Sequence, residues 1–318
     1  MLLIPMQARN WKSAPCGRIL HRAALLSAAI ALAYSSTYTR AAELEPRAYA
    51  NAPIGLNFLI AGFAKSEGGL STDPASPIQD AHLNINTGVL AYARSLDVWG
   101  KSGKIDIIMP FSDLSGTALV GGQPAQRQVA GLNDARLRFS VNFIGAPALS
   151  VQEFANYRQD LIVGASCQVS APTGQYDPNR LVNIGSNRWF IKPDIGISKA
   201  LGAFTLELSA GVFFFTKNDD YYGGGTLEQD PVYTTQAHIT YSFGNGVWVA
   251  LDGTYDLGGQ TTVNGVQNDD AMENSRFGAT LAVPLNRNYS IKLYASSGVS
   301  TRTGSDYKLA GTALQYRW

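Results

Sequence analysis

The side chains best suited to chemistry gather around His238, in the stretch TTQAHITYSF. Thr240 and Ser242 follow at intervals of two residues, so in an extended strand their hydroxyls share a face with the imidazole. A histidine beside a hydroxyl is what nucleophilic hydrolysis needs, and this keeps a hydrolase among the alternatives. No His, Asp or Glu cluster has metal-ligand spacing, and no Walker or dinucleotide motif is present. The sequence therefore predicts neither an enzyme nor a cofactor or metal site.

Lys192 and Asp194 form a second candidate group, in the stretch NRWFIKPDIG. They stand two residues apart and so share one face of a strand. Pro193 between them cannot donate a ladder hydrogen bond, which predicts a local irregularity. A structural ion pair is the default interpretation, and a latch for a substrate is the alternative.

Composition indicates how such residues could be positioned. The chain has 318 residues, of which 45% are hydrophobic and 15% charged, whereas soluble domains carry about a quarter charged residues. The net charge of +1 predicts no nucleic-acid partner. After residue 54 no stretch approaches the twenty apolar residues of a membrane helix.

The first 42 residues have the pattern of a secretory signal peptide. Basic residues precede an apolar run from Ala23 to Tyr34, and small residues follow as far as Ala41 and Ala42. The run is too short to cross a bilayer as a helix, so we expect cleavage near Ala41 or Ala42. A retained helical anchor is the alternative. Cleavage would leave Cys167 alone, which excludes an intramolecular disulfide.

Alternation of apolar and polar residues runs through the rest of the chain. In ARLRFSVNF, for example, Leu137 and Phe139 oppose Arg136 and Arg138, which is typical of strands. Twelve or so strands are predicted to begin near Ile54, His82, Gly103, Asp134, Asp160, Arg188, Phe204, Val232, Gly246, Arg276, Tyr289 and Asp306. Short links between them alternate with long polar links, as in transmembrane barrels with short periplasmic turns and long extracellular loops. One link, at residues 148–157, has helical composition instead.

We therefore predict an all-β fold, a transmembrane antiparallel up-and-down β-barrel of about 12 strands, over residues 43–318. Hydrocarbon offers no hydrogen-bond partner, so the last strand must pair with the first. Its final residue is Trp318, an aromatic ring at the end of an alternating strand. The aromatic residues predicted at the membrane interfaces are Trp99, Trp189, Phe204, Phe243, Tyr289 and Trp318. Outer-membrane lipid is thus an expected partner.

The polar face of these strands predicts the lining of the barrel lumen. Its charged members are Arg94, Asp106, Arg136, Arg138, Lys192, Asp194, Glu207, His238, Asp252, Arg276 and Lys292. They could line a solute path, or they could form ion pairs that brace a closed interior. The same parity turns several large apolar residues inward, namely Leu90, Tyr92, Phe190, Phe213, Phe215 and Tyr294. These side chains predict a constricted or gated path rather than a wide water channel.

Four stretches of the chain resemble a known family. They are LEPRAYANAPIGLNFLIAGFA (44–64), GAPAL (145–149), APTGQYD (171–177) and NRWFIKPDIGISKALG (187–202). They are similar to the outer-membrane family named for the MetA-pathway, the meta-pathway of phenol degradation, whose members are described as transporters. The resemblance implies an outer-membrane barrel that passes small hydrophobic or aromatic compounds.

The terminal aromatic also resembles the signal that the barrel assembly machinery recognises, so this machinery is an implied partner. The alternatives to transport are a structural or adhesive barrel and an outer-membrane lipid hydrolase. The sequence leaves open the substrate, the oligomeric state, and whether the lumen is plugged.

Overall fold

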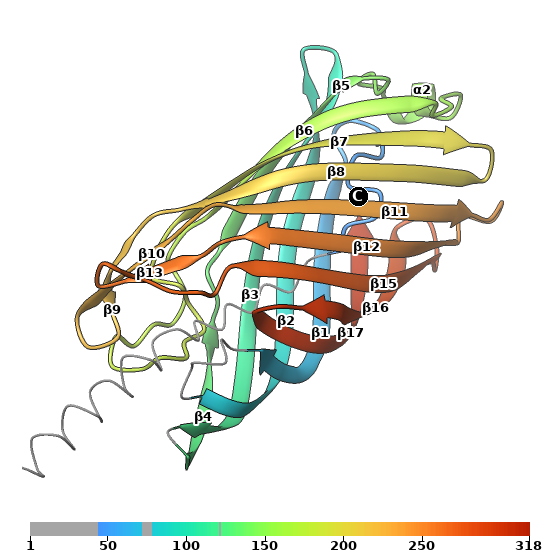
Figure 1. Cartoon of the computed structure of the whole chain (residues 1–318). Helices are drawn as coiled ribbons and strands as arrows, with labels where there is room; N and C mark the ends of the chain where they lie inside the picture. The colour runs from blue at the N-terminus through green and yellow to red at the C-terminus, as the bar shows by residue number, and fades with distance from the viewer. Residues whose placement is uncertain (1–43, 72–77, 121) are drawn as a thin grey trace, which may run out of the picture.

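A computed structural model describes residues 44–71, 78–120 and 122–318. The predicted signal peptide, residues 1–42, lies outside the described residues. The described chain forms a closed antiparallel barrel whose wall has twelve strands (Figure 1). The prediction of an all-β barrel of about 12 strands is confirmed.

The strands of the wall follow one another around the ring in chain order. They are β1 (Asn57–Ser71), β2 (Ile78–Val98), β3 (Lys101–Val120), β5 (Arg136–Ile144), β6 (Leu161–Ser170), β7 (Phe190–Leu201), β8 (Phe204–Phe215), β11 (Val232–Ser242), β12 (Trp248–Gly258), β15 (Met272–Pro284), β16 (Tyr289–Thr301) and β17 (Gly304–Arg317). Each pairs with the next in antiparallel register, so the ring of strands closes without a free edge.

The last strand closes the ring on the first. β17 pairs with β1 from Phe58↔Arg317 onward, and beyond this ladder Trp318 and Asn57 exchange two backbone hydrogen bonds. The amide of Asn57 donates to the carbonyl of Trp318 at 3.0 Å, and the amide of Trp318 donates back at 3.1 Å. Trp318 therefore ends a paired strand at the rim, as the alternation of the C-terminal residues predicts.

One end of the barrel carries mostly short turns, at residues 99–100, 202–203, 243–247 and 285–288. The longer link at this end contains α2 (Val151–Phe154), which is shorter than the helical composition of residues 148–157 suggested. Its cap is Ser150, whose hydroxyl accepts from the amide of Glu153 at 3.3 Å. Among the described residues, none of the helices has the length and apolar character to cross a membrane.

The opposite end is more ordered than the long polar links suggested. β4 (Gln123–Leu132) folds back on β3 as a projecting hairpin, seen in green at the bottom of Figure 1. β9 (Asn218–Tyr221), β10 (Gly225–Gln229), β13 (Thr261–Val263) and β14 (Val266–Gln267) form a separate small sheet. The connection between β16 and β17 at this end is only residues 302–303, so the alternation of long and short links is not complete.

The distribution of side chains is inverted relative to a soluble protein. Large apolar residues such as Ile107, Leu251 and Phe277 are exposed on the outer face of the wall, while Asp106, Thr240 and many other polar residues are buried inside. This arrangement suits a wall whose outer face meets hydrocarbon.

Candidate functional site in the barrel lumen

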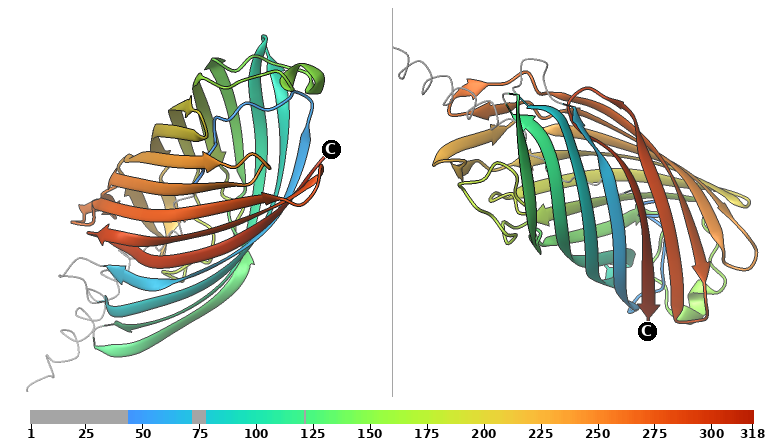
Figure 2. Two further views of the ribbon diagram at one scale, coloured as in Figure 1. Left: turned by 90° about the vertical axis from the view of Figure 1, so that its right-hand side faces the viewer. Right: turned by 90° about the horizontal axis from the view of Figure 1, so that it is seen from below.

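The candidate site begins with the segment before β1, which enters the barrel. Residues 44–56 run inside the ring of strands, where they appear as the thin blue line in the left view of Figure 2. At the rim Ser95 holds the segment, because its hydroxyl accepts from the amide of Leu56 at 2.9 Å and donates to the carbonyl of Pro53 at 2.6 Å. Further in, residues 46–49 form a turn closed by the amide of Ala48 and the carbonyl of Glu45 at 3.2 Å.

Tyr49 occupies a slot made by two glycines. Gly164 of β6 and Gly196 of β7 are cross-strand partners on the inner face. A Cβ at Gly164 would lie 2.6 Å from the Tyr49 ring, and a Cβ at Gly196 would lie 2.1 Å from it. Asn142 of β5, in the same row, donates from Nδ2 to the Tyr49 carbonyl at 3.0 Å. The wall is therefore shaped to receive this ring.

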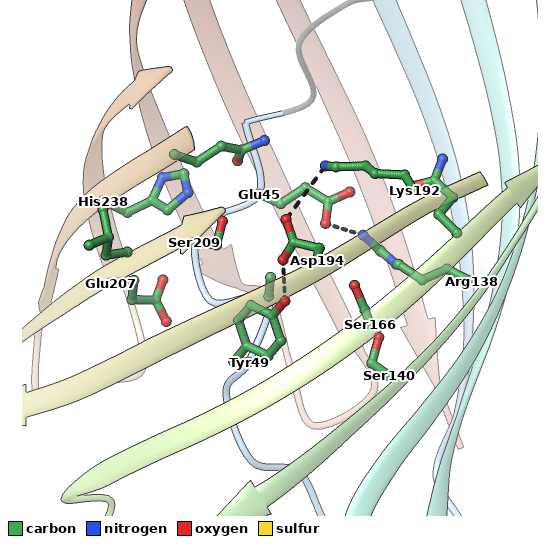
Figure 3. A pocket seen from close by; sticks show the side chains of 14 residues that line it. Glu45, Tyr49, Arg138, Ser140, Ser166, Lys192, Asp194, Glu207, Ser209 and His238 are labelled. Carbon is green, nitrogen blue, oxygen red and sulfur yellow. Dashed lines mark hydrogen bonds and ion pairs between the residues drawn. The ribbon is translucent and has the colours of Figure 1, made fainter. Parts of the chain in front are cut away.

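The hydroxyl of Tyr49 donates a hydrogen bond to Asp194 (Figure 3). Burial raises the pKa of Tyr49, and the bond to Asp194 raises it further, so the phenol stays a donor. The other oxygen of Asp194 lies 3.8 Å from Nζ of Lys192. The predicted pair is thus present in the lumen, and its carboxylate anchors the inserted segment.

Glu45 makes the second anchor, with Arg138 of β5. Nε of Arg138 also donates to Asp106 at 2.9 Å, and Lys104 lies 3.7 Å from the same carboxylate. Burial raises the pKa of Glu45, but Arg138, Lys104 and Lys192 outweigh this and lower it to about 2. Glu45 is therefore ionised at any physiological pH.

Arg47 lies between these anchors in a left-handed conformation with φ of 67°. Its backbone amide donates to Oε2 of Glu207 at 2.5 Å, and the hydroxyl of Ser198 donates to the other oxygen at 2.9 Å. The Arg47 guanidinium lies 5.5 Å from the centroid of the Trp248 ring. The segment thus presents one cation to the open part of the lumen.

A cavity of about 570 Å³ lies beside the segment. It is bounded by the inserted turn on one side and by the inner faces of β1–β3, β5, β12 and β15–β17 on the other. Aliphatic and aromatic side chains, including Ile60, Trp248 and Tyr294, share its lining with charged groups. This volume lies within the range of small-molecule sites.

An aromatic cluster lines the lumen on the other side of Lys192. Phe190 packs edge-on against Phe213 with ring centroids 5.4 Å apart, and Phe213 stacks with Phe215 at 6.3 Å. Arg188 lies 4.5 Å from the Phe215 centroid, and Lys192 lies 5.1 Å from that of Phe213. The predicted inward orientation of these rings agrees with these contacts.

His238 is engaged by a carboxylate rather than by a neighbouring hydroxyl. Its Nδ1 lies 2.7 Å from Oδ1 of Asp252, whose other oxygen accepts from the hydroxyl of Thr280 at 2.9 Å. His238, Asp252 and Thr280 are all buried. These three side chains lie on the inner face of the wall, and their hydrogen bonds link the neighbouring strands β11, β12 and β15.

The structure places most predicted lumenal residues on the inner face. These are Asp106, Arg136, Arg138, Lys192, Asp194, Glu207, His238, Asp252, Arg276 and Lys292. Arg276 donates to the carbonyl of Tyr307 at 3.0 Å and lies over its ring.

Arg94, by contrast, was predicted wrongly. It is exposed on the outer face of β2, while its neighbours Ala93 and Ser95 line the cavity. Leu90 and Tyr92 share its face and also point outward, contrary to their predicted inward orientation. The reason is that small apolar residues line the lumen here, so both faces of β2 are apolar. Arg94 lies near the rim, where a long cationic side chain can reach the headgroup region.

The predicted interface aromatics occupy both ends of the wall. Trp99 is 97% exposed in a short turn, and Phe204, Phe243 and Tyr289 lie beside other short turns. Trp318 stacks on Tyr316 with ring centroids 5.3 Å apart. Trp189 precedes β7 at the opposite end.

Sequence reasoning missed Glu45, Arg47 and Tyr49 as lumenal residues. A signal was present, because LEPRAYANAPIG carries charges and two prolines, yet lacks the alternation of a strand. The cross-strand glycines that receive Tyr49 could not be paired without the register.

Comparisons with known proteins agree with this architecture. A family model described as "Putative MetA-pathway of phenol degradation" matches residues 63–318. An outer membrane channel from Pseudomonas putida F1 has a similar structure, with a TM-score of 0.75 and 20% identity over 87% of this chain and 100% of that one. The transport unit of the autotransporter AIDA-I from Escherichia coli gives a TM-score of 0.52 and 8% identity over 91% of this chain and 97% of that one. None of the curated proteins compared with the chain matches it.

Proposed function

The chain belongs to the family described as "Putative MetA-pathway of phenol degradation", and from this membership we propose that it is an outer-membrane channel. Its solutes are small hydrophobic or aromatic compounds, which cross by passive or gated diffusion through the barrel. Outer-membrane lipid surrounds the wall, and the predicted export signal and assembly machinery bring the chain there.

The observation that carries this proposal is the cavity of about 570 Å³ inside a closed wall, lined in part by Ile60, Trp248 and Tyr294. A barrel with a purely structural or adhesive role needs no internal space of this kind. The aromatic cluster of Phe190, Phe213 and Phe215 offers rings on which a planar apolar solute can stack.

The inserted segment supports a constricted path rather than an open pore. Glu45 and Tyr49 attach it to Arg138 and Asp194 on the wall, and a cavity of about 40 Å³ lies among these groups. The lumen is therefore narrow where the segment crosses it. Release of the turn would widen the path without breaking a strand pairing.

Flux into proteoliposomes tests the proposal. Purified protein should accelerate the passage of phenol along its gradient without an energy source, relative to liposomes that contain heat-denatured protein. A variant that lacks residues 44–53 should pass phenol faster than the full chain. If neither protein accelerated the passage of phenol, the structural or adhesive alternative would replace the channel.

A further inference from the structure

We propose that the cavity beside the inserted segment binds aromatic carboxylates, with the carboxylate between Arg47 and Lys292 and the ring against Trp248. The inference rests on the proposed channel function and names the solute class that the channel favours.

The charges that line the cavity are unbalanced. Five cations line it, namely Arg47, Lys104, Arg136, Arg138 and Lys292, against the two carboxylates Glu45 and Asp106. Both carboxylates are engaged with Arg138, and Lys104 lies next to Asp106. The surplus is therefore positive, and a confined positive surplus attracts anions.

Arg47 and Lys292 are the cations most open to a ligand. Within the described part of the chain, neither side chain lies within ion-pair distance of a carboxylate, although Glu207 attracts the Arg47 guanidinium electrostatically. Arg47 is exposed to the lumen, and Lys292 is half-buried in the cavity lining. A carboxylate solute could thus form charge-assisted hydrogen bonds with both without breaking an existing ion pair.

The register places the aromatic wall of the site next to these cations. Trp248, Ala282 and Lys292 form one inward row across β12, β15 and β16. Two strand spacings of about 4.8 Å separate Trp248 from Lys292, and Ala282 between them leaves the row open. Arg47 lies over the Trp248 ring. A single aromatic ring with its carboxylate could therefore lie along this row, with the ring beside the indole and the carboxylate toward Lys292.

Binding to the detergent-purified full chain tests the inference, with benzoate and its neutral analogue benzyl alcohol as probes in isothermal titration calorimetry. Benzoate should bind at least about tenfold more tightly, which corresponds to about 1.4 kcal/mol, because charge-assisted hydrogen bonds are stronger than neutral ones. Arg47→Gln and Lys292→Gln should each remove most of this preference and leave benzyl alcohol unaffected.

Lys199→Gln is the matched control, because Lys199 pairs with Asp160 at the barrel rim, outside the cavity. It changes the net charge equally and should leave the benzoate preference intact. Equal affinity for the two probes, or a preference that survives both cavity variants, would overturn the inference.

Phenol flux measured on the same preparations separates the two proposals. Flux without a preference for benzoate would overturn only the proposed carboxylate site. A preference for benzoate without flux would overturn only the proposed channel.

Discussion

The carboxylates where the inserted segment meets the wall each have a donor within reach. Glu45 meets Arg138, Asp194 meets Tyr49, and Glu207 accepts from the amide of Arg47. A buried charge is costly unless it is paired and hydrogen-bonded. Docking of the turn satisfies wall carboxylates as well as the turn's own groups, which explains how a short segment without secondary structure can stay in a polar lumen.

Tyr49→Phe should loosen the segment. The ring would still fill the slot at Gly164 and Gly196, but the buried carboxylate of Asp194 would lose its hydroxyl donor, at a cost of about 1–3 kcal/mol. We expect a higher single-channel conductance with more frequent transitions between levels.

Tyr157→Phe provides the control for this variant. Tyr157 donates its hydroxyl to the carbonyl of Gly145 at 2.8 Å in the rim link, outside the lumen. Its conductance should equal that of the parent. Identical traces for Tyr49→Phe and the parent would contradict the anchoring role of the phenol.

Acid should release the Glu45 anchor. The pKa of Glu45 falls from 4.5 to about 2 in the docked segment, so its pairing with Arg138 stabilises docking fully above about pH 4.5 and loses that effect as the pH falls through 2. Conductance should stay constant from pH 7 to about pH 4 and rise below it. Planar-bilayer recordings across this range measure the change.

Glu45→Gln should raise conductance at neutral pH and flatten the rise in acid, because the amide cannot titrate. Glu153→Gln, in the exposed first turn of α2, should keep the parent's profile. An unchanged acid rise in Glu45→Gln would assign the transition to other lumenal carboxylates, such as Asp106 or Asp194.

At the scale of the strands, period-two alternation was enough to predict the wall. Strands such as β5 and β12 carry charges on one face and large apolar residues on the other, so parity assigns both faces. The inner and outer faces of β2 were interchanged at Arg94, Leu90 and Tyr92. Both faces of this strand are apolar, so the single charge of Arg94 near the rim was the only guide to which face is polar. The inserted segment could not be predicted because its place depends on cross-strand contacts that the sequence alone does not reveal.

Ile107→Arg and Ile108→Arg test the two faces of one strand with the same substitution. Ile107 is exposed on the outer face of β3, whereas Ile108 lines the cavity. An arginine that faces lipid near mid-membrane costs about 2–4 kcal/mol, but one in the cavity stays hydrated. Ile107→Arg should therefore lower the midpoint of urea unfolding in vesicles far more than Ile108→Arg, and equal midpoints would show that the faces are assigned wrongly.

At the scale of the whole molecule, closure and the inserted segment share one end of the barrel. The ring closes where β1 meets β17, and the segment enters directly before β1. Asn57 pairs with Trp318 at this point, and one residue earlier Leu56 is held by Ser95. The first and last strands of the wall therefore meet where the inserted segment enters, so the same part of the rim positions both the closure of the wall and the segment.

Deletion of Trp318 should impair assembly of the barrel. The variant loses the two backbone hydrogen bonds with Asn57, each with a net contribution of about 0.5–1.5 kcal/mol, and the interfacial ring that stacks on Tyr316. Less folded protein should appear in the outer-membrane fraction, as measured by the heat-dependent gel shift. Trp318→Phe should restore most of the yield, since it keeps both the backbone pairing and an aromatic ring.

Trp189→Ala is the control for this deletion. It removes an indole of similar exposure, 48% against 49% for Trp318, from the opposite end of the wall. Trp189→Ala should give the parent's yield of folded protein. If its yield fell as much as that of the Trp318 deletion, interfacial indoles in general, rather than closure at the C-terminus, would limit insertion.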